Sequence, residues 1–173
     1  MSEQSKTLEI MRRIGAPKPE KIRITGILQS PELSSLTVVM TQEVNDSSAE
    51  LLRLFGDQEI NVRFISKYSD ANGDTSLCIC IDPAFFETAV DLVDVNENAL
   101  HIKEFVYRSQ VRVISIYPHK ERARVAERLF TTLRMNGIDP LSTNNASSVI
   151  SCVISGEHIQ QALACLDQAF ELP

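Results

Sequence analysis

The sequence predicts an α+β fold made of two βαββαβ units, each with an antiparallel sheet and two helices on one face. Three observations lead to this prediction. Strand-like and helix-like segments follow one another in the same order twice. The second half lacks a fourth strand, while one extra strand precedes the first half. Related residues stand at matching places in the two halves: Leu54-Phe55 and Leu129-Phe130, Cys78 and Cys152, Ala89 and Ala162.

The first unit starts with the β-rich run LTVVMT at residues 36–41. A helix with a leucine-rich stripe follows, and then two strands that an Asn72-Gly73 turn joins into a hairpin. Asp82-Pro83 opens a second helix, because aspartate caps the helix and proline fits its first position. The other strands of this unit are predicted at residues 60–68, 75–81 and 101–107.

The second unit repeats this order. Its first helix carries an apolar face and is stopped by Gly137. A short extended segment and a polar turn replace the longer hairpin of the first unit. The elements are a strand at 111–117, a helix at 122–136, an extended segment at 138–143, a turn at 144–147, a strand at 149–154 and a helix at 157–170.

A strand at residues 21–28 alternates apolar and polar side chains but belongs to neither unit. Because the second unit has an empty sheet edge, we expect this strand to fill it, so that the first unit is inserted into the second. The predicted domains are residues 34–109 for the first unit, and 21–30 with 110–173 for the second. Residues 1–20 are predicted to be a flexible arm with one short helical stretch at 8–14.

The composition of the 173 residues excludes several classes of function. Seventeen Lys and Arg stand against 23 Asp and Glu, and this net charge of −6 disfavours nucleic acid as a partner. No apolar run is long enough to cross a membrane, and the N-terminus lacks the apolar core of a secretory signal, so we expect a cytoplasmic protein without membrane contact. The four cysteines lie in apolar segments, which favours buried thiols over disulfides.

No pattern of catalytic residues is found. The three histidines lie on separate elements without a triad partner, and no glycine-rich phosphate loop is present. We therefore expect no enzyme activity and no cofactor. Cys78 and Cys80 face the same side of one strand, so a two-ligand corner of a zinc site remains an alternative to core packing, but the sequence has neither a CxxC nor an HxxxH motif and predicts no metal site.

Several segments resemble the regulatory region of aspartokinases, a pair of ACT domains with ferredoxin-like βαββαβ topology. In the first half these are ITGILQSPELSSLTVV at 24–39 and QEINVRFIS at 58–66. In the second half they are VRVISI at 111–116, VAERLFTTLRMNGID at 125–139 and SVISCVISGEHIQQALACLDQAFEL at 148–172. The likeness lies in the order and spacing of the elements, from about Ile22 to Leu172.

This resemblance implies a non-catalytic regulatory protein that binds a free amino acid, lysine or threonine, in feedback control of the biosynthesis of aspartate-derived amino acids. It implies a homodimer with the effector at its interface, and an aspartokinase catalytic subunit as a further partner. Family effector contacts come from the first strand–helix loop and from the second strand of the neighbouring unit. Carried onto this chain, they are Glu43, Asn45, Asp46, Ser47, Ser48, Asn61 and Lys67.

Elementary chemistry supports a site of this kind. The start of a helix offers unpaired N–H groups to the carboxylate of an amino acid, and Glu43 or Asp46 can receive its ammonium group. Asn61 is placed to bridge to a loop or effector. The Pro-Gly pair usual in the family loop is replaced by Asn45 and Asp46. An ordinary helix cap at residues 45–48, and a solvated charge at Lys67, remain the alternatives.

Other functional classes also remain open. The chain is alternatively a stand-alone ACT regulator of another enzyme or of transcription, or a ferredoxin-like module that has lost ligand binding. An RNA-binding module of this topology needs aromatic residues on its central strands, where this sequence has Cys78, Ile79 and Cys152. An acylphosphatase needs glycines around its phosphate-loop arginine, and Arg122 has none.

Overall fold

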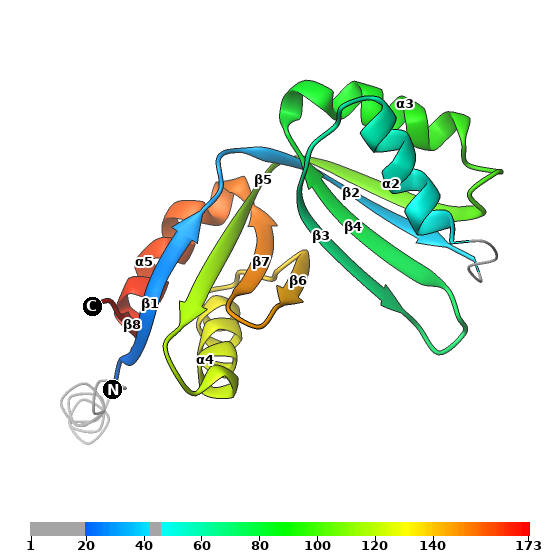
Figure 1. Ribbon diagram of the computed structural model, residues 1–173. Coiled ribbons are helices and arrows are strands. Elements are labelled where there is room, and N and C mark those ends of the chain that lie inside the picture. Colours follow the sequence, from blue (N-terminus) through cyan, green and yellow to red (C-terminus); the bar gives the residue numbers. More distant parts are fainter. Residues whose placement is uncertain (1–19, 42–45) are drawn as a thin grey trace, which may run out of the picture.

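The computed structural model describes residues 20–41 and 46–173. The predicted arm, with its helical stretch at 8–14, lies almost wholly outside these residues. Strands and helices alternate in the predicted order (Figure 1). The elements are β1 (Ile22–Gln29), β2 (Leu33–Met40), α2 (Ser47–Asp57), β3 (Val62–Ser69), β4 (Thr75–Ile81), η1 (Pro83–Phe85), α3 (Phe86–Val95), β5 (Ile102–Pro118), α4 (Arg122–Met135), β6 (Ser142–Asn145), β7 (Ile150–Ser155), η2 (Gly156–His158), α5 (Ile159–Ala169) and β8 (Phe170–Glu171).

The eight strands form one continuous sheet, which the 17-residue strand β5 carries from the first unit into the second. The first half of β5 pairs with β2, and the order of strands in the first unit is β3-β4-β2-β5. Its second half pairs with β7 and β1. The sequence predicted two separate strands at 101–107 and 111–117, which was wrong. Gln110 takes a left-handed conformation (φ 55°) and turns the strand into the second unit without ending it.

Strand β1 lies beside β5 in the second unit, with Ile27 opposite Ile116. The predicted insertion of the first unit into the second is therefore confirmed. Strand β8 was not predicted, because the apolar pattern of α5 runs on into Phe170. It pairs in parallel with β1, an exception to the otherwise antiparallel sheet. Strand β6 takes in residues 144 and 145, which the sequence analysis placed in a turn.

Each unit buries its two helices against one face of its sheet (Figure 1). The first unit packs α2 and α3 around Leu51, Phe55 and Ile79, and the second packs α4 and α5 around Leu129, Ile114 and Leu166. Burial of such side chains supplies about 1.5–3 kcal/mol each. A third apolar cluster lies on the opposite faces of the sheets and contains Leu33, Phe64, Cys78, Cys80, Val111, Val113 and Val153.

That third cluster holds residues of both units, so it fixes the units against each other. Gly156 lies at the same junction, because a side-chain carbon there would come within 2.5 Å of the carbonyl oxygen of Gln110. Glycine is the residue that allows the start of η2 to approach the bend in β5 this closely.

Candidate functional site

The start of α2 is closed by the side chain of Asp46. This residue has a left-handed backbone (φ 53°), and its carboxylate accepts a hydrogen bond from the Ala49 N–H at 3.4 Å. Ser47 and Ser48 form the first turn and are both buried. Within the segment 45–48, where a helix cap was predicted, Asp46 therefore acts as the cap, and the two serines pack into the protein interior.

Lys67 lies next to this helix start. Strands β2 and β3 are both antiparallel to β4, so their carboxyl ends lie at the same end of the sheet in the first unit. The Lys67 ammonium nitrogen lies 3.9 Å from the Asp46 carboxylate, with 41% of one side chain and 68% of the other exposed. Two of the predicted site residues thus meet as a loose, solvent-accessible pair of opposite charges.

Asn61 does not join this pair within the part of the chain that the structure describes. Asn61 is exposed and precedes Val62, so it stands at the opposite end of β3 from Lys67. Glu43 and Asn45 lie outside the described residues. A single chain therefore does not bring Asn61 and Asp46 to one small ligand.

The corresponding helix start in the second unit is built differently. Glu121 repeats the left-handed conformation of Asp46 (φ 51°), but its side chain makes no capping hydrogen bond. Arg122 instead donates to the carbonyl oxygens of Ala146 and Ser147 and to the side-chain oxygen of Asn145. The turn between β6 and β7 is thereby held at the start of α4, with the cationic side chain of Arg122 between them.

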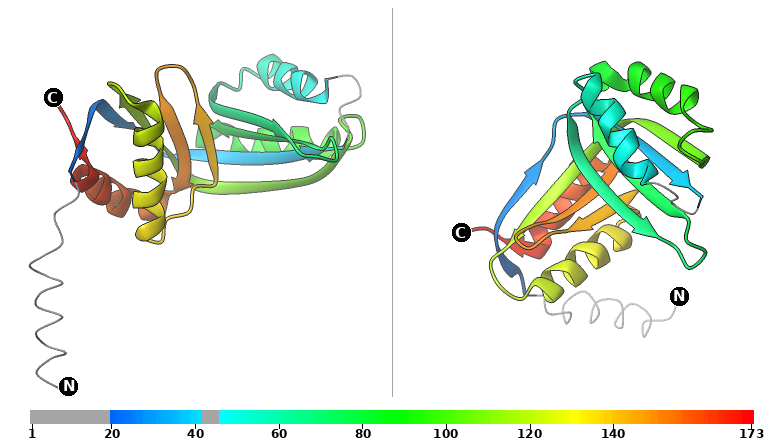
Figure 2. Two further views of the ribbon diagram at one scale, coloured as in Figure 1. Left: turned by 90° about the horizontal axis from the view of Figure 1, so that it is seen from below. Right: turned by 45° about the vertical axis from the view of Figure 1, so that its right-hand side comes forward.

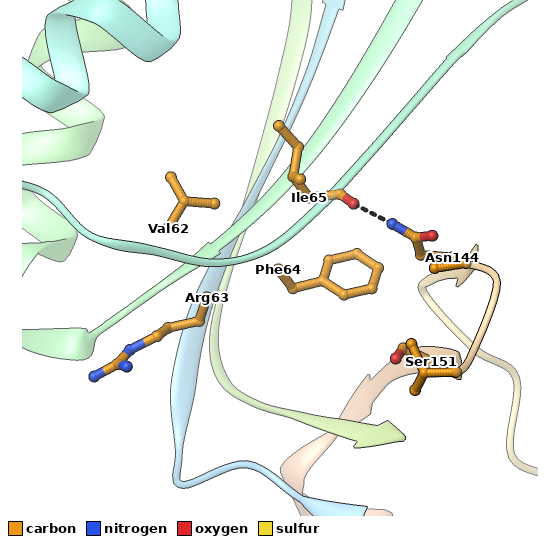
Figure 3. A pocket seen from close by; sticks show the side chains of 8 residues that line it. Val62, Arg63, Phe64, Ile65, Asn144 and Ser151 are labelled. Atoms are coloured by element: carbon orange, nitrogen blue, oxygen red, sulfur yellow. Dashed lines mark hydrogen bonds between the residues drawn. The ribbon is translucent and has the colours of Figure 1, made fainter. Parts of the chain in front are cut away.

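A pocket of about 250 Å³ lies between β3 and the β6–β7 hairpin (Figure 3). The Asn144 amide donates a hydrogen bond to the Ile65 carbonyl oxygen at 2.7 Å across it. Phe64 points into the space toward Asn144 and Ser151, whereas the side chain of Arg63 points away from them. Ser66 and Ser142 share a further hydrogen bond of 2.6 Å between the two strands. This contact between the units was not predicted, because no sequence pattern relates residues 65 and 144.

The cysteines are free thiols. Cys78 and Cys80 both belong to the apolar cluster between the units, and the contact with Cys78 together with burial raises the pKa of Cys80. Burial raises the pKa of Cys152 to about 12. In the described residues, no three His, Cys, Asp or Glu side chains come close enough to hold a metal ion. Nor do the described residues include a helix of the length and apolarity that crossing a membrane requires.

The sequence matches no protein-family model and no curated protein. Solved structures do match. The regulatory subunit of aspartate kinase from Thermus flavus has a TM-score of 0.77 at 16% identity, over 86% of this chain and 99% of that one. The ligand-free regulatory subunit from Thermus thermophilus has a TM-score of 0.74 at 17% identity, over 86% and 99%.

A third match is aspartokinase III from E. coli in complex with lysine and aspartate, in the T-state. Its TM-score is 0.62 at 14% identity, over 88% of this chain and 34% of the kinase chain. The present chain therefore spans about a third of that enzyme, but nearly the whole of the separate regulatory subunits. At these identities the likeness is one of fold: the chain has the tandem ACT fold of aspartokinase regulatory subunits.

Proposed function

We propose that this protein is a non-catalytic regulatory module that binds a free amino acid and controls a partner enzyme, with an aspartokinase catalytic subunit as the first candidate. The observation that carries this proposal is the match in fold, along almost their entire length, to regulatory subunits of aspartate kinase. In this proposal the module has the two domains expected from the sequence, residues 34–109 and residues 21–30 with 110–173. Four free thiols fit a cytoplasmic location, where cysteines stay reduced.

The effector site in this proposal is the start of α2. A free amino acid carries an ammonium group and a carboxylate, and Asp46 and Lys67 offer the opposite charge to each. Their separation of 3.9 Å in exposed positions makes the bond between them weak. An amino acid can therefore enter between them, with its ammonium on Asp46 and its carboxylate on Lys67 and on the N–H groups of the first helical turn.

The effector is lysine or threonine in this proposal, and it lies where two copies of the chain meet. In this proposal Asn61 comes to the Asp46–Lys67 pair from the second copy, because within one chain it precedes β3 at the end remote from Lys67. An effector that contacts two copies favours the dimer geometry in which both contacts are made. The partner enzyme then senses that geometry, and the change in its activity is limited by the difference in effector affinity between the two geometries.

Isothermal titration of the protein with lysine, threonine and a panel of other amino acids tests this site. We expect one of the panel to bind, and Lys67→Ala and Asp46→Asn each to weaken binding at least tenfold. Lys120→Ala, which removes a lysine near the start of α4, is the matched control and should leave affinity unchanged. Binding that survives both Lys67→Ala and Asp46→Asn would contradict the site, and silence across the whole panel would contradict effector binding itself.

One observation favours a second candidate, an ACT module that binds no effector and acts through contacts with other proteins. The Asp46 carboxylate already occupies the Ala49 N–H that an effector carboxylate would take. Under this alternative the protein serves another enzyme or a transcription complex as a stand-alone regulator. Inhibition assays of aspartokinase catalytic subunits, with and without this protein, separate the two: a changed response to lysine or threonine supports the first candidate.

A further inference from the structure

A cavity of about 340 Å³ lies where the two units meet, beside the bend in β5. Figure 2 shows this strand passing from the first unit into the second. Ser109 and Val111, on either side of the left-handed Gln110, both line the cavity. Phe86, the first residue of α3, lines it from the first unit, and Leu141, just before β6, lines it from the second. Cavities between domains are common places for small molecules to bind.

The walls of this cavity expose apolar side chains to solvent. Tyr107 also lines it and is 52% exposed, while Leu141 is 40% exposed. The Phe86 ring meets Tyr107 edge-on with ring centres 5.5 Å apart, and Phe105 stacks on Tyr107 at 6.2 Å. Aromatic rings favour such arrangements, so a further flat ring can join this row. A ring between Tyr107 and Leu141 would remove apolar surface of both units from water.

Among the described residues that line the cavity, Arg108 is the one with a charged side chain. It forms no ion pair with any other described residue, so its charge is available to a ligand. The guanidinium group presents planar pairs of N–H donors that match the two oxygens of a carboxylate. One positive charge also balances a carboxylate better than a phosphate monoester, whose charge is about −1.5 to −2.

The cavity does not suit a free amino acid. Its described lining contains no Asp or Glu, and an ammonium group there would lie near the charge of Arg108. The Ser155 hydroxyl, which does line it, donates a hydrogen bond to Glu157 at 3.2 Å. That carboxylate has a second neighbour in the His158 ring, 3.5 Å away, and it does not line the cavity. The lining therefore matches a negative charge and a flat apolar group, without a positive charge.

We propose that this cavity binds a small aromatic carboxylate that has no ammonium group. The carboxylate pairs with Arg108, and the ring lies between Tyr107 and Leu141. Since these contacts come from both units, the ligand favours the arrangement of the units in which all of them are made.

This second site is separate from the proposed effector site. Lys67 lies on β3, at one edge of the sheet in the first unit, whereas Arg108 lies on β5, with β4 and β2 between the two strands. A variant at Arg108 therefore leaves the Asp46–Lys67 pair intact. Failure of this site and failure of effector binding are measured separately.

Isothermal titration of the full chain with 3-phenylpropanoate tests the ligand chemistry. We expect binding with a dissociation constant of about 1 mM or below. The alcohol 3-phenylpropanol has the same ring without the charge and should bind at least tenfold more weakly. L-phenylalanine adds an ammonium group and should also bind at least tenfold more weakly, measured in Lys67→Ala so that the effector site is disabled.

Variants on the two walls test the place of binding. Arg108→Gln removes the charge and Leu141→Asp adds an opposing one, and each should weaken 3-phenylpropanoate at least tenfold. Both side chains are exposed, so the thermal melts without ligand should match that of the wild type. Arg134→Gln and Leu172→Asp change exposed residues elsewhere and are the matched controls, with no expected effect.

Three results would overturn the proposal. The first is no binding of 3-phenylpropanoate at about 10 mM. The second is binding that Arg108→Gln leaves unchanged, or that Lys67→Ala abolishes, since the ligand would then lie outside this cavity. The third is L-phenylalanine binding in Lys67→Ala as tightly as 3-phenylpropanoate, which would show that the cavity does not reject an ammonium group.

Discussion

The starts of α2 and α4, the first helix of each unit, have the same backbone conformation but differ in the side-chain contacts that they make. Asp46 and Glu121 both adopt the left-handed conformation just before their helices. In the first unit an acidic side chain caps the helix and lies near Lys67. In the second unit Arg122 ties the helix start to the β6–β7 turn. The repeated backbone is therefore closed by different side-chain contacts in the two units.

The far ends of the same helices repeat more closely. The Ile60 N–H donates a hydrogen bond to the Phe55 carbonyl oxygen, and the Ile138 N–H donates one to the Leu133 carbonyl oxygen. Each helix therefore ends with the 6→1 hydrogen bond of a Schellman motif. The left-handed position in this motif is Glu59 in one unit and Gly137 in the other. The first unit thus keeps a side chain, Glu59, in a backbone conformation that favours glycine. Matched substitutions at the two positions measure how much this lowers the free energy of unfolding.

The largest expected effect lies at the junction of the units. Gly156→Ala should lower the free energy of unfolding by about 1–3 kcal/mol, because its side chain collides with the Gln110 backbone and the surroundings must shift. Pro83→Ala, at the matching first position of η1, is the control, with an expected loss below about 1 kcal/mol. Urea denaturation compares them, and equal losses in the two variants would show that the junction is not tightly packed.

The helix ends should respond with opposite signs. Gly137→Ala forces a side chain into a left-handed position and should cost about 1–2 kcal/mol. Glu59→Gly relieves the same strain in the first unit and should add about 0.5 kcal/mol, because the greater freedom of glycine in the unfolded chain offsets part of the gain. Thermal melts of the two variants measure this; a loss of stability in Glu59→Gly would contradict the matching of the two motifs.

The smallest effect concerns the caps. Asp46→Ala should cost about 0.5–1 kcal/mol more than Glu121→Ala, since only Asp46 bonds to a backbone N–H of its helix. Glu121 makes an exposed ion pair with Arg124, which contributes little, and both alanines would carry the same backbone strain. Denaturant titration of the two variants gives the difference. An equal loss in both would mean that the 3.4 Å bond to Ala49 contributes nothing to stability.

Most of the architecture was predictable from local patterns. Alternation predicted β1, the Asn72-Gly73 turn predicted the return strand β4, and Asp82 before Pro83 correctly placed the start of the helical segment η1–α3. The joining of two predicted strands into the single strand β5 was not predictable. It depends on the left-handed backbone of Gln110, and glutamine is not a residue type that favours this conformation. The two-residue strand β8 depends on pairing with β1, a contact that only the folded chain supplies.

The candidate site was predictable in part. Asp46 was among the expected caps, and Lys67 was expected on the second strand, but their meeting depends on how the ends of β2 and β3 adjoin in the sheet. Asn61 was predicted on the second strand, but it precedes the first residue of β3, Val62, at the end remote from Asp46. Arg122 was weighed only as a phosphate-loop arginine, which its surroundings disfavour. Its contacts were not predictable, since the three acceptors lie more than twenty residues further along the chain.

Hydrogen exchange with and without a saturating amino acid compares the two helix starts within one molecule and tests the central claim most directly. Slower exchange is expected at residues 46–52, at the start of α2, with no change at residues 121–127, at the start of α4. Protection at 121–127 instead, or unchanged exchange at both helix starts for every amino acid that binds, would contradict the assignment of the effector to the first unit.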